Sequence, residues 1–255
     1  HAAAYKHVPM QEQNPWEAVQ TNIQGTINLV DCAEVFEVER FVLVSTDKAV
    51  NPTNVMGASK RVAEQVIQAR SVDTSVKYMA VRFGNVIGSS GSVIPTFQEQ
   101  INNGGPVTIT DPNIKRYFMS IPEAAQLILQ AGSIGQGGEI FVLDMGEPVL
   151  IKDIAVELIK LSGFTPDVDI PIDYIGLRPG EKMFEELITK GENITDSPHE
   201  KIMILKNEVK HGWNQTLAES EKVVISSKSY NADQIKKTLN KIVPEYSPAK
   251  QEKDN

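Results

Sequence analysis

Residues 45 to 60 gather side chains that could carry acid–base chemistry. The segment reads Ser-Thr-Asp-Lys-Ala-Val-Asn-Pro-Thr-Asn-Val-Met-Gly-Ala-Ser-Lys and follows an apolar run at 41–44 that is typical of a buried strand. Thr46 supplies a hydroxyl, Asp47 a carboxylate and Lys48 an amine. Open α/β sheets bind their ligands at the carboxyl ends of strands, so the sequence predicts a reactive crevice at this point.

The same segment continues through an Asn-Pro turn into a helix expected over 55–70. Met56 and Lys60 lie four residues apart, so this helix would place both on one face, one turn from each other. A thioether has no proton to give, so Met56 is not an acid or a base. The helix therefore brings the amine of Lys60 to the crevice.

The elements around this segment alternate in the manner of a βαβ fold. Asn14 is expected to cap a helix that has Pro15 at its first position, and Glu17 follows in the first turn. Continuous apolar runs predict buried parallel strands, and short turns between strands and helices are typical of a doubly wound sheet. Strands are expected at 41–46 and 77–84.

The pattern changes after residue 85 and predicts a mixture of short elements. Ser120 and Glu123 form a capping-box pattern that opens one of the helices. The last residues, 247–255, are polar and are expected to form a tail. Helices are expected at 94–103, 121–131, 151–161 and 231–243, and strands at 106–110, 116–119 and 139–144.

Composition excludes several classes of protein. With 255 residues, 41% of them hydrophobic, the chain is long enough to bury a sizeable core. Its net charge of -8 argues against non-specific nucleic-acid binding. The single cysteine, Cys32, forms no internal disulfide and fits a reducing compartment. The four histidines lack the spacing of metal ligands, so no metal site is expected.

Taken together, these residues resemble the active site of the extended short-chain dehydrogenase/reductases. Within them, the chain is similar to the nucleotide-sugar 4,6-dehydratases of bacterial polysaccharide and glycan biosynthesis, in particular the branch acting on UDP-N-acetylglucosamine. That branch also carries Met where most of the superfamily has the Tyr of a Tyr-x-x-x-Lys pair. The resemblance covers roughly residues 1 to 190 and includes Arg-Phe-Gly-Asn-Val-Ile-Gly at 82–88 and Arg-Pro-Gly-Glu-Lys at 178–182.

The resemblance implies that the front of the cofactor domain is missing. The family opens with a strand, a G-x-G-x-x-G loop and a helix that hold the dinucleotide pyrophosphate, whereas residues 1–9 resemble a segment just after its fourth strand. The expected fold is α/β, a Rossmann-like doubly wound parallel sheet without its N-terminal strands and glycine-rich loop, plus a smaller α/β substrate-binding lobe. Residues 1–90 would be the C-terminal half of the NAD-binding domain. Residues 91–190 would form the lobe, interleaved with the last Rossmann strands, and 191–255 a C-terminal extension and tail.

The implied reaction is a redox-neutral dehydration with bound NAD as cofactor. Hydride leaves the sugar C4, water is lost across C5 and C6, and the hydride returns to C6. Asp47 would protonate the departing 6-hydroxyl, Thr46 would bond the 4-hydroxyl, and Lys60 would hold the nicotinamide ribose. Lys48 would take the C5 proton, which requires its pKa to fall through burial or a nearby cation. Because Met56 transfers no proton, the base at the 4-hydroxyl stays open.

The remaining site residues are assigned by the resemblance. Two arginine forks would clamp the diphosphate, since a guanidinium matches phosphate oxygens. Asn85 would donate to a phosphate oxygen, and Glu181 would accept a ribose hydroxyl. Expected NAD contacts are Ala2, Ala3, Lys6, Ser45, Lys60 and Phe83, and expected substrate contacts are Asn85, Arg116, Arg178 and Glu181.

Two other interpretations of the function remain open. A UDP-sugar 4-epimerase of the same fold returns the hydride to C4 and needs no acid–base pair for C5 and C6, so Asp47 and Lys48 favour dehydration. A non-catalytic nucleotide-sugar-binding module is suggested by Met56 and by the absent phosphate loop, and the fragment alone could be inactive. The resemblance also implies a UDP-sugar as partner, a homo-oligomer formed through helices near 15–38 and 55–70, and a cytoplasmic location. That location includes the case of a cytoplasmic domain whose membrane anchor lies upstream.

Overall fold

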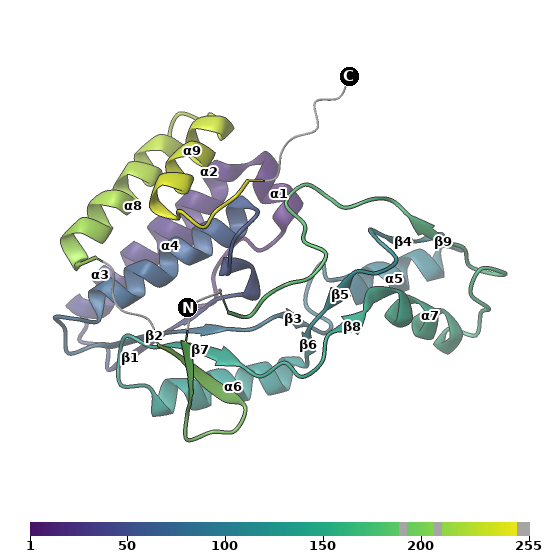
Figure 1. Cartoon of the computed structure of the whole chain (residues 1–255), viewed down its shortest axis with the longest axis horizontal. Helices are drawn as coiled ribbons and strands as arrows, with labels where there is room; N and C mark the ends of the chain where they lie inside the picture. Colours follow the sequence, from purple (N-terminus) through teal and green to yellow (C-terminus); the bar gives the residue numbers. More distant parts are fainter. Residues whose placement is uncertain (189–192, 207–210, 249–255) are drawn as a thin grey trace.

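The computed structural model describes residues 1–188, 193–206 and 211–248, and a five-stranded sheet lies at its centre (Figure 1). Three strands run parallel, and two more continue the sheet in the antiparallel sense, in the order β1-β2-β7-β11-β10. The two inner parallel strands β2 and β7 are buried almost throughout, because helices cover both faces of the sheet. The strands are β1 (Arg40–Val44), β2 (Lys77–Arg82), β7 (Ile140–Leu143), β10 (Asn193–Asp196) and β11 (Ile202–Lys206).

One face of the sheet is covered by two layers of helices. In the inner layer, side chains such as Ile23 and Ile67 are fully buried in one apolar cluster with Leu43 and Tyr78 of the sheet. The outer helices α8 and α9 pack on α4 and on the N-terminal helices (Figure 1). The inner elements are η1 (Val19–Gln24), α3 (Gly25–Val35) and α4 (Val55–Arg70), and the others are α1 (Val8–Gln13), α2 (Pro15–Ala18), α8 (Trp213–Ser227) and α9 (Ala232–Ile242).

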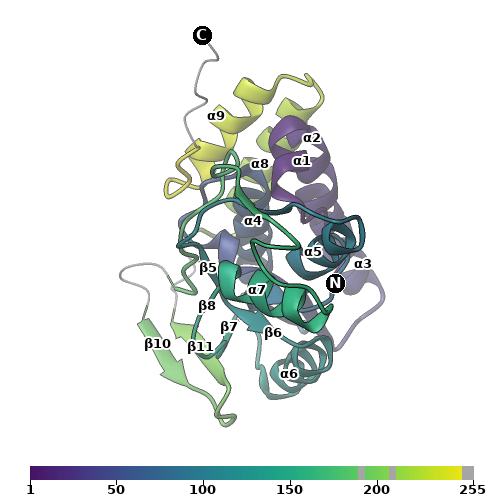
Figure 2. The ribbon, with the colours of Figure 1, turned by 90° about the vertical axis from the view of Figure 1, so that its right-hand side faces the viewer.

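The opposite face of the sheet is covered by α6 (Ile121–Ile134), seen below the sheet in Figure 2. Ser120 caps this helix by accepting a hydrogen bond from the amide of Glu123, as its sequence pattern predicts. Leu127 packs with Met79 of the sheet in a second apolar cluster. The layering is that of a Rossmann-like α/β fold.

A smaller lobe projects from the carboxyl ends of the parallel strands, with a core of its own. Phe97 and Ile101 of its first helix pack against Ile159 of its second, and all three are buried. Of three two-stranded sheets in this part of the chain, the one formed by residues 85–86 and 118–119 lies between the main sheet and the lobe helices (Figure 1). The elements are β3 (Asn85–Val86), α5 (Val93–Asn102), β4 (Val107–Ile109), β5 (Lys115–Arg116), β6 (Phe118–Met119), β8 (Val149–Leu150), α7 (Ile151–Leu161) and β9 (Ile172–Tyr174).

Most expected elements are confirmed, and the differences have local causes. The strand expected at 116–119 is two strands, because β5 pairs with β8 while β6 pairs with β3. Asn14 precedes α2, but its side chain donates to the carbonyl of Met10 and does not cap the helix. Helix α8 and the β10–β11 hairpin have no counterpart in the sequence prediction. The tail expected at 247–255 lies mostly outside the described residues.

Candidate active site

The reactive groups lie where the main sheet passes into the lobe. Beyond the end of β1, the amides of Ser45 and Asp47 still donate to carbonyls of Val81 and Phe83, so the chain stays tied to β2. A short 3-10 helix, η2 (Asp47–Ala49), then turns the chain, and Thr46 caps it by accepting from the Lys48 amide at 3.3 Å. Thr46, Asp47 and Lys48 are therefore held by backbone geometry at the carboxyl end of a strand, as their sequence position predicts.

The first turn of α4 is fastened beside this segment. Asn54 caps α4 by accepting from the Gly57 amide at 2.8 Å. The carboxylate of Glu12 accepts from the Val55 amide at 2.6 Å, so it satisfies another open amide at the helix start. A Cβ placed on Gly57 would lie 2.0 Å from the Lys48 carbonyl oxygen, so only glycine permits this close approach.

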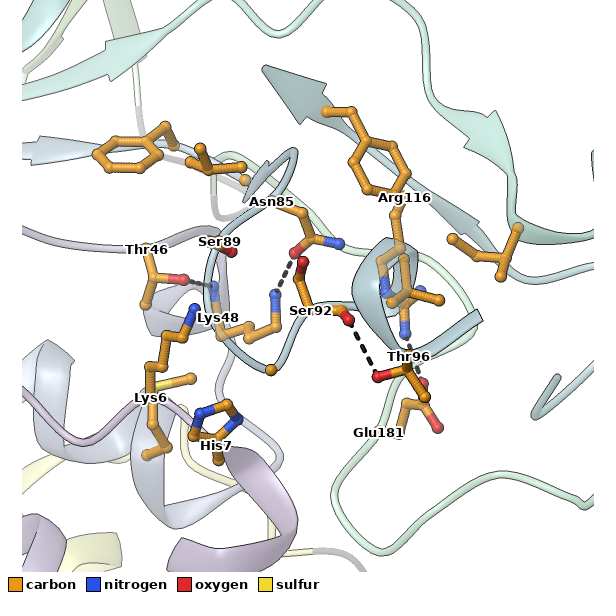
Figure 3. Close-up of a pocket in the computed structure, with 18 of the residues that line it drawn as sticks. Lys6, His7, Thr46, Lys48, Asn85, Ser89, Ser92, Thr96, Arg116 and Glu181 are labelled. Carbon is orange, nitrogen blue, oxygen red and sulfur yellow. Dashed lines mark hydrogen bonds and ion pairs between the residues drawn. The ribbon is translucent and has the colours of Figure 1, made fainter. Parts of the chain in front are cut away.

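A cavity of about 440 Å³ opens between the main sheet and the lobe. Figure 3 shows Lys48 reaching toward Asn85, with Lys6 and His7 entering the same space from the N-terminal segment. Two expected site residues do not line the cavity: Ala3, and Asp47, which lies buried behind the wall. The expected residues that do line it are Ala2, Lys6, Ser45, Thr46, Lys48, Met56, Lys60, Phe83, Asn85, Arg116, Arg178 and Glu181.

Lys48 and Asp47 form a close ion pair at the cavity wall. The Lys48 ammonium donates to Asp47 Oδ1 at 3.0 Å and to Asn85 Oδ1 at 3.2 Å, and the Thr46 hydroxyl donates to the same Asp47 oxygen at 2.9 Å. Burial by itself would lower the pKa of Lys48, but the carboxylates of Asp47 and Glu185 outweigh it and raise that pKa. The lowered pKa expected for Lys48 is therefore not found in the free structure.

Lys60 is one of two lysines lining the cavity whose pKa is lowered, and Lys6 is the other. The Lys60 side chain is buried at the cavity wall near Met56, and burial lowers its pKa to about 8, although Glu64 opposes that shift. Ser45 is also oriented by Glu64, because its hydroxyl donates to Glu64 Oε1 at 2.6 Å. Lys60 and Ser45 line the cavity as expected, and a buried carboxylate that the sequence prediction did not include lies beside both.

The two arginines expected to clamp a diphosphate differ in their surroundings. Arg116 is buried, and its guanidinium donates to the carbonyls of Lys115, Lys182 and Met183 and to Glu181 Oε1 at 3.2 Å. Most N–H donors of the Arg116 guanidinium are therefore already bonded to other groups of the protein, which leaves few for a diphosphate. Arg178 is exposed at the rim of the cavity, and its backbone amide donates to the Glu181 carboxylate.

Sequence reasoning missed two groups of residues near the cavity. Polar residues of the turn before α5 line it together with residues of the lobe, and their signal was the glycine-rich turn that follows Asn85. Glu185 is buried with its Oε1 3.9 Å from the Lys48 ammonium, and no sequence signal pairs residues so distant in the chain. The missed lining residues are Tyr5, His7, Ser89, Ser92, Thr96, Thr108 and Thr110.

The sequence profile described as "Polysaccharide biosynthesis protein" matches residues 1–207. This chain belongs to that family. A family relative, the capsular polysaccharide biosynthesis protein CapD of Staphylococcus aureus, is 59% identical over 203 residues, which cover 79% of this chain. The matched region is 34% of CapD, so the chain spans about a third of that relative's length.

Solved structures place this family member among short-chain dehydrogenase/reductases with a Rossmann-like fold. The X-ray structure of Pen from Bacillus thuringiensis aligns with a TM-score of 0.76 at 38% identity and covers 82% of this chain and 66% of Pen. The UDP-glucose 4-epimerase of Thermus thermophilus, solved with NAD, aligns with a TM-score of 0.66 at 21% identity, covers 73% of this chain and 67% of its own, and shows a shared fold. This chain thus shares its family with a capsular polysaccharide biosynthesis protein and its fold with both solved structures.

No helix within 1–188, 193–206 or 211–248 combines the length and the apolar character needed to cross a bilayer. In the same ranges, no group of three or more His, Cys, Asp or Glu side chains is arranged to hold a metal ion.

Proposed function

We propose that this chain carries the sugar-binding side and the acid–base pair of an NAD-dependent 4,6-dehydratase acting on a UDP-sugar, UDP-N-acetylglucosamine in the first instance. The observation that carries the proposal is the 3.0 Å contact between Asp47 and Lys48 at the wall of a cavity at the carboxyl end of β1. Elimination of water needs an acid at the leaving hydroxyl and a base at the neighbouring carbon, and this pair supplies one of each.

The protonation state of the pair follows from its geometry. In the free structure, the Lys48 side chain is an ammonium paired with Asp47, since the pKa of Lys48 is raised. Moving one proton from Lys48 Nζ to Asp47 Oδ1 converts them into an amine and a carboxylic acid. Excluding water favours this neutral form, because charged groups lose more on desolvation. Substrate that fills the cavity would therefore prepare Lys48 to take the C5 proton and Asp47 to protonate the 6-hydroxyl.

The cavity wall fits a nicotinamide group. The Lys60 amine, buried at the wall, would hold the nicotinamide ribose, and the apolar surfaces of Met56 and Phe83 would lie against the ring. Lys6 would contact the cofactor from the N-terminal segment. Bound NAD would supply reversible hydride acceptance, so the overall reaction would be redox-neutral. The Thr46 hydroxyl would orient the sugar 4-hydroxyl.

The proposed substrate lies toward the lobe. Arg178, exposed at the cavity rim, is the cation available to a diphosphate, while Arg116 acts by holding Glu181 and the surrounding backbone in place. Asn85 anchors the Lys48 ammonium through its side-chain oxygen and lines the same cavity. The diphosphate is thus expected on the side of the cavity away from Lys60.

A UDP-sugar 4-epimerase is the second candidate, and one observation favours it. An epimerase needs no base at C5, and the free structure holds Lys48 as an ammonium. The fold is shared with a UDP-glucose 4-epimerase as well, so fold similarity does not separate the two reactions.

The test uses the chain extended upstream through the expected glycine-rich cofactor segment, incubated with UDP-N-acetylglucosamine and followed by mass spectrometry. Loss of one water without added NADH is expected. An isomer of unchanged mass would favour the epimerase, and tight binding without conversion would favour a binding module.

The variant Asp47→Asn sharpens this test. It should lower the elimination rate by roughly 10²- to 10⁴-fold while sparing sugar-nucleotide binding, because an amide is isosteric but provides no acid. Asp31→Asn, on an exposed position of α3, is the matched control and should leave the rate unchanged. Elimination that survives in Asp47→Asn would show that the acid is another group.

A further inference from the structure

A second buried carboxyl, Glu185, lies on the far side of Lys48 from Asp47. Its side chain is 4% exposed, and its Oε1 is 3.9 Å from the Lys48 ammonium. Among the described residues, the other oxygen, Oε2, has no hydrogen-bond partner, and the same holds for Oδ2 of Asp47. A buried carboxylate oxygen without a donor is costly, so each of these two oxygens requires an explanation.

The cluster formed by Asp47, Lys48 and Glu185 has fewer positive than negative groups. Two carboxyl groups face one ammonium, and the two other cations that act on Glu185 bind elsewhere. Arg116 donates to Glu181 and to backbone carbonyls, and Lys182 donates to the Val50 carbonyl at 2.9 Å and to Glu186. Like charges confined to one buried site do not both ionise readily, so one proton stays on the carboxyl pair.

The distances of the two carboxyl groups from the Lys48 ammonium favour Glu185, rather than Asp47, as the group that holds this proton. Asp47 lies 3.0 Å from the ammonium and also accepts from the Thr46 hydroxyl, whereas Glu185 lies 3.9 Å away. Burial raises the pKa of Glu185, and Asp47 raises it further, against the lowering effects of Lys48, Arg116 and Lys182. A protonated Glu185 would also remove the anionic charge from its unpartnered oxygen.

We propose that Glu185 is a positioning residue that holds a proton in the resting site and so allows Lys48 to pass its own proton to Asp47. This inference rests on the proposed dehydratase function. When Glu185 is neutral, only Asp47 holds the Lys48 proton, and the proton moves from Nζ to Oδ1 with no other bond changed. When Glu185 is ionised, two carboxylates retain the ammonium, and the base at C5 is lost.

The predicted pH dependence has a distinctive sign. A lysine base acting alone would gain activity as the pH rises, because its amine form increases. Here activity falls as the pH rises through the titration of Glu185, since ionised Glu185 keeps Lys48 protonated. The groups facing Glu185 that enter this balance are Lys48, Asp47, Arg116 and Lys182.

The first test compares the pH profile of kcat in the upstream-extended chain with that of Glu185→Gln. The glutamine cannot ionise, so the alkaline fall should move upward by at least about one pH unit or disappear. Glu157→Gln, the same change at an exposed carboxylate of α7, should keep the wild-type profile. Parallel profiles for wild type and Glu185→Gln would overturn the inference.

The second test needs no turnover. Infrared spectra at pH 7 of the protein labelled with carboxyl-¹³C glutamate should show the carbonyl stretch of a protonated carboxyl, and this band should disappear as the pH rises. Glu185→Gln should remove the band, and Glu157→Gln, at an exposed carboxylate, should keep it. The band together with no dehydration would reject the proposed function alone, whereas dehydration without the band would reject the role of Glu185 alone.

Discussion

Two buried clusters of charged side chains lie on either side of the same short segment, and they are built in opposite ways. Behind Ser45, Glu64 is fully buried, and both of its oxygens accept hydrogen bonds, from Ser45, from Arg82 at 2.8 Å and from Arg61 at 3.0 Å. Burial would raise the pKa of Glu64, but Arg82 and Arg61 outweigh it and lower that pKa to about 2.

Around Lys48, two carboxyl groups compete for one ammonium, and each keeps an oxygen without a partner in the described structure. A fully compensated cluster, in which every charge is paired and every oxygen accepts a hydrogen bond, resists any change of protonation, so its role is to stabilise the fold. An undercompensated cluster has two protonation states of similar free energy, which proton chemistry requires. The two clusters therefore differ in hydrogen-bond satisfaction, and the less satisfied one is the cluster that we propose to transfer protons.

The largest expected effect comes from breaking the compensated cluster. Glu64→Gln leaves the buried guanidinium of Arg82 without its carboxylate and should lower the free energy of unfolding by about 3–5 kcal/mol. Urea unfolding followed by tryptophan fluorescence would measure this. The Glu64 carboxylate contributes fully to the free energy of unfolding above its unfolded pKa of about 4.3, and this contribution is lost as the pH falls through about 2. The difference in the free energy of unfolding between wild type and Glu64→Gln should therefore become smaller as the pH falls from about 4.3 to about 2.

Glu157→Gln is the control for that measurement. It removes an exposed pair with Lys160 on α7 and should change the free energy of unfolding by less than about 0.5 kcal/mol. A Glu64→Gln protein as stable as wild type would show that the two clusters do not differ as described.

An intermediate effect is expected at Lys60, which lies between the two clusters. Its folded pKa of about 8 is below the unfolded value of about 10.4, so between these pH values the unfolded chain binds more protons. Stability should therefore rise with pH across this window relative to Lys60→Met, by up to about 3 kcal/mol. Urea titrations of both proteins from pH 7 to pH 10.5 would measure the slope, and a constant difference between them would contradict the assignment.

The smallest expected effect is at the edge of the compensated cluster. Glu245, in the segment after α9, pairs with Arg61 Nε at 2.9 Å, but both side chains reach solvent in part. Glu245→Gln should lower the free energy of unfolding by only about 0.5–1 kcal/mol, because Arg61 keeps its contact with Glu64. The loss should be smaller at high salt, because salt screens a partly exposed ion pair. Thermal unfolding at low and high salt would test this expectation. A loss of stability as large as that for Glu64→Gln would show that the Glu245 carboxylate is as important to the buried cluster as Glu64.

Local sequence pattern determined much of the fold and part of the site. The helix expected over 55–70 has the observed bounds, because a capping asparagine and a turn proline mark its start. The β10–β11 hairpin was missed because β10 is short and polar. The apolar run at 202–205 in β11 is a strand signal that the sequence prediction did not use. Thr46, Asp47 and Lys48 were found because they follow a strand directly.

Charge states were less predictable than positions. The pKa of Lys60 is lowered and that of Lys48 is raised, although the sequence suggested a lowered pKa for Lys48. The carboxylate of Asp47 opposes the effect of burial on Lys48 most strongly, and Glu185, when ionised, adds to it through the packing of the segment after Arg178. A pKa depends on neighbours in space, so spacing along one segment does not determine it.

The glycine at the start of α4 also limits how this site can change over generations. With the Lys48 carbonyl in the space that any side chain at position 57 would need, the η2 turn and the first turn of α4 can be altered only together. Substitutions that alter the chemistry of the site are therefore expected to accumulate in the lobe and the cavity rim, where side chains face open space, before they appear where η2 meets α4.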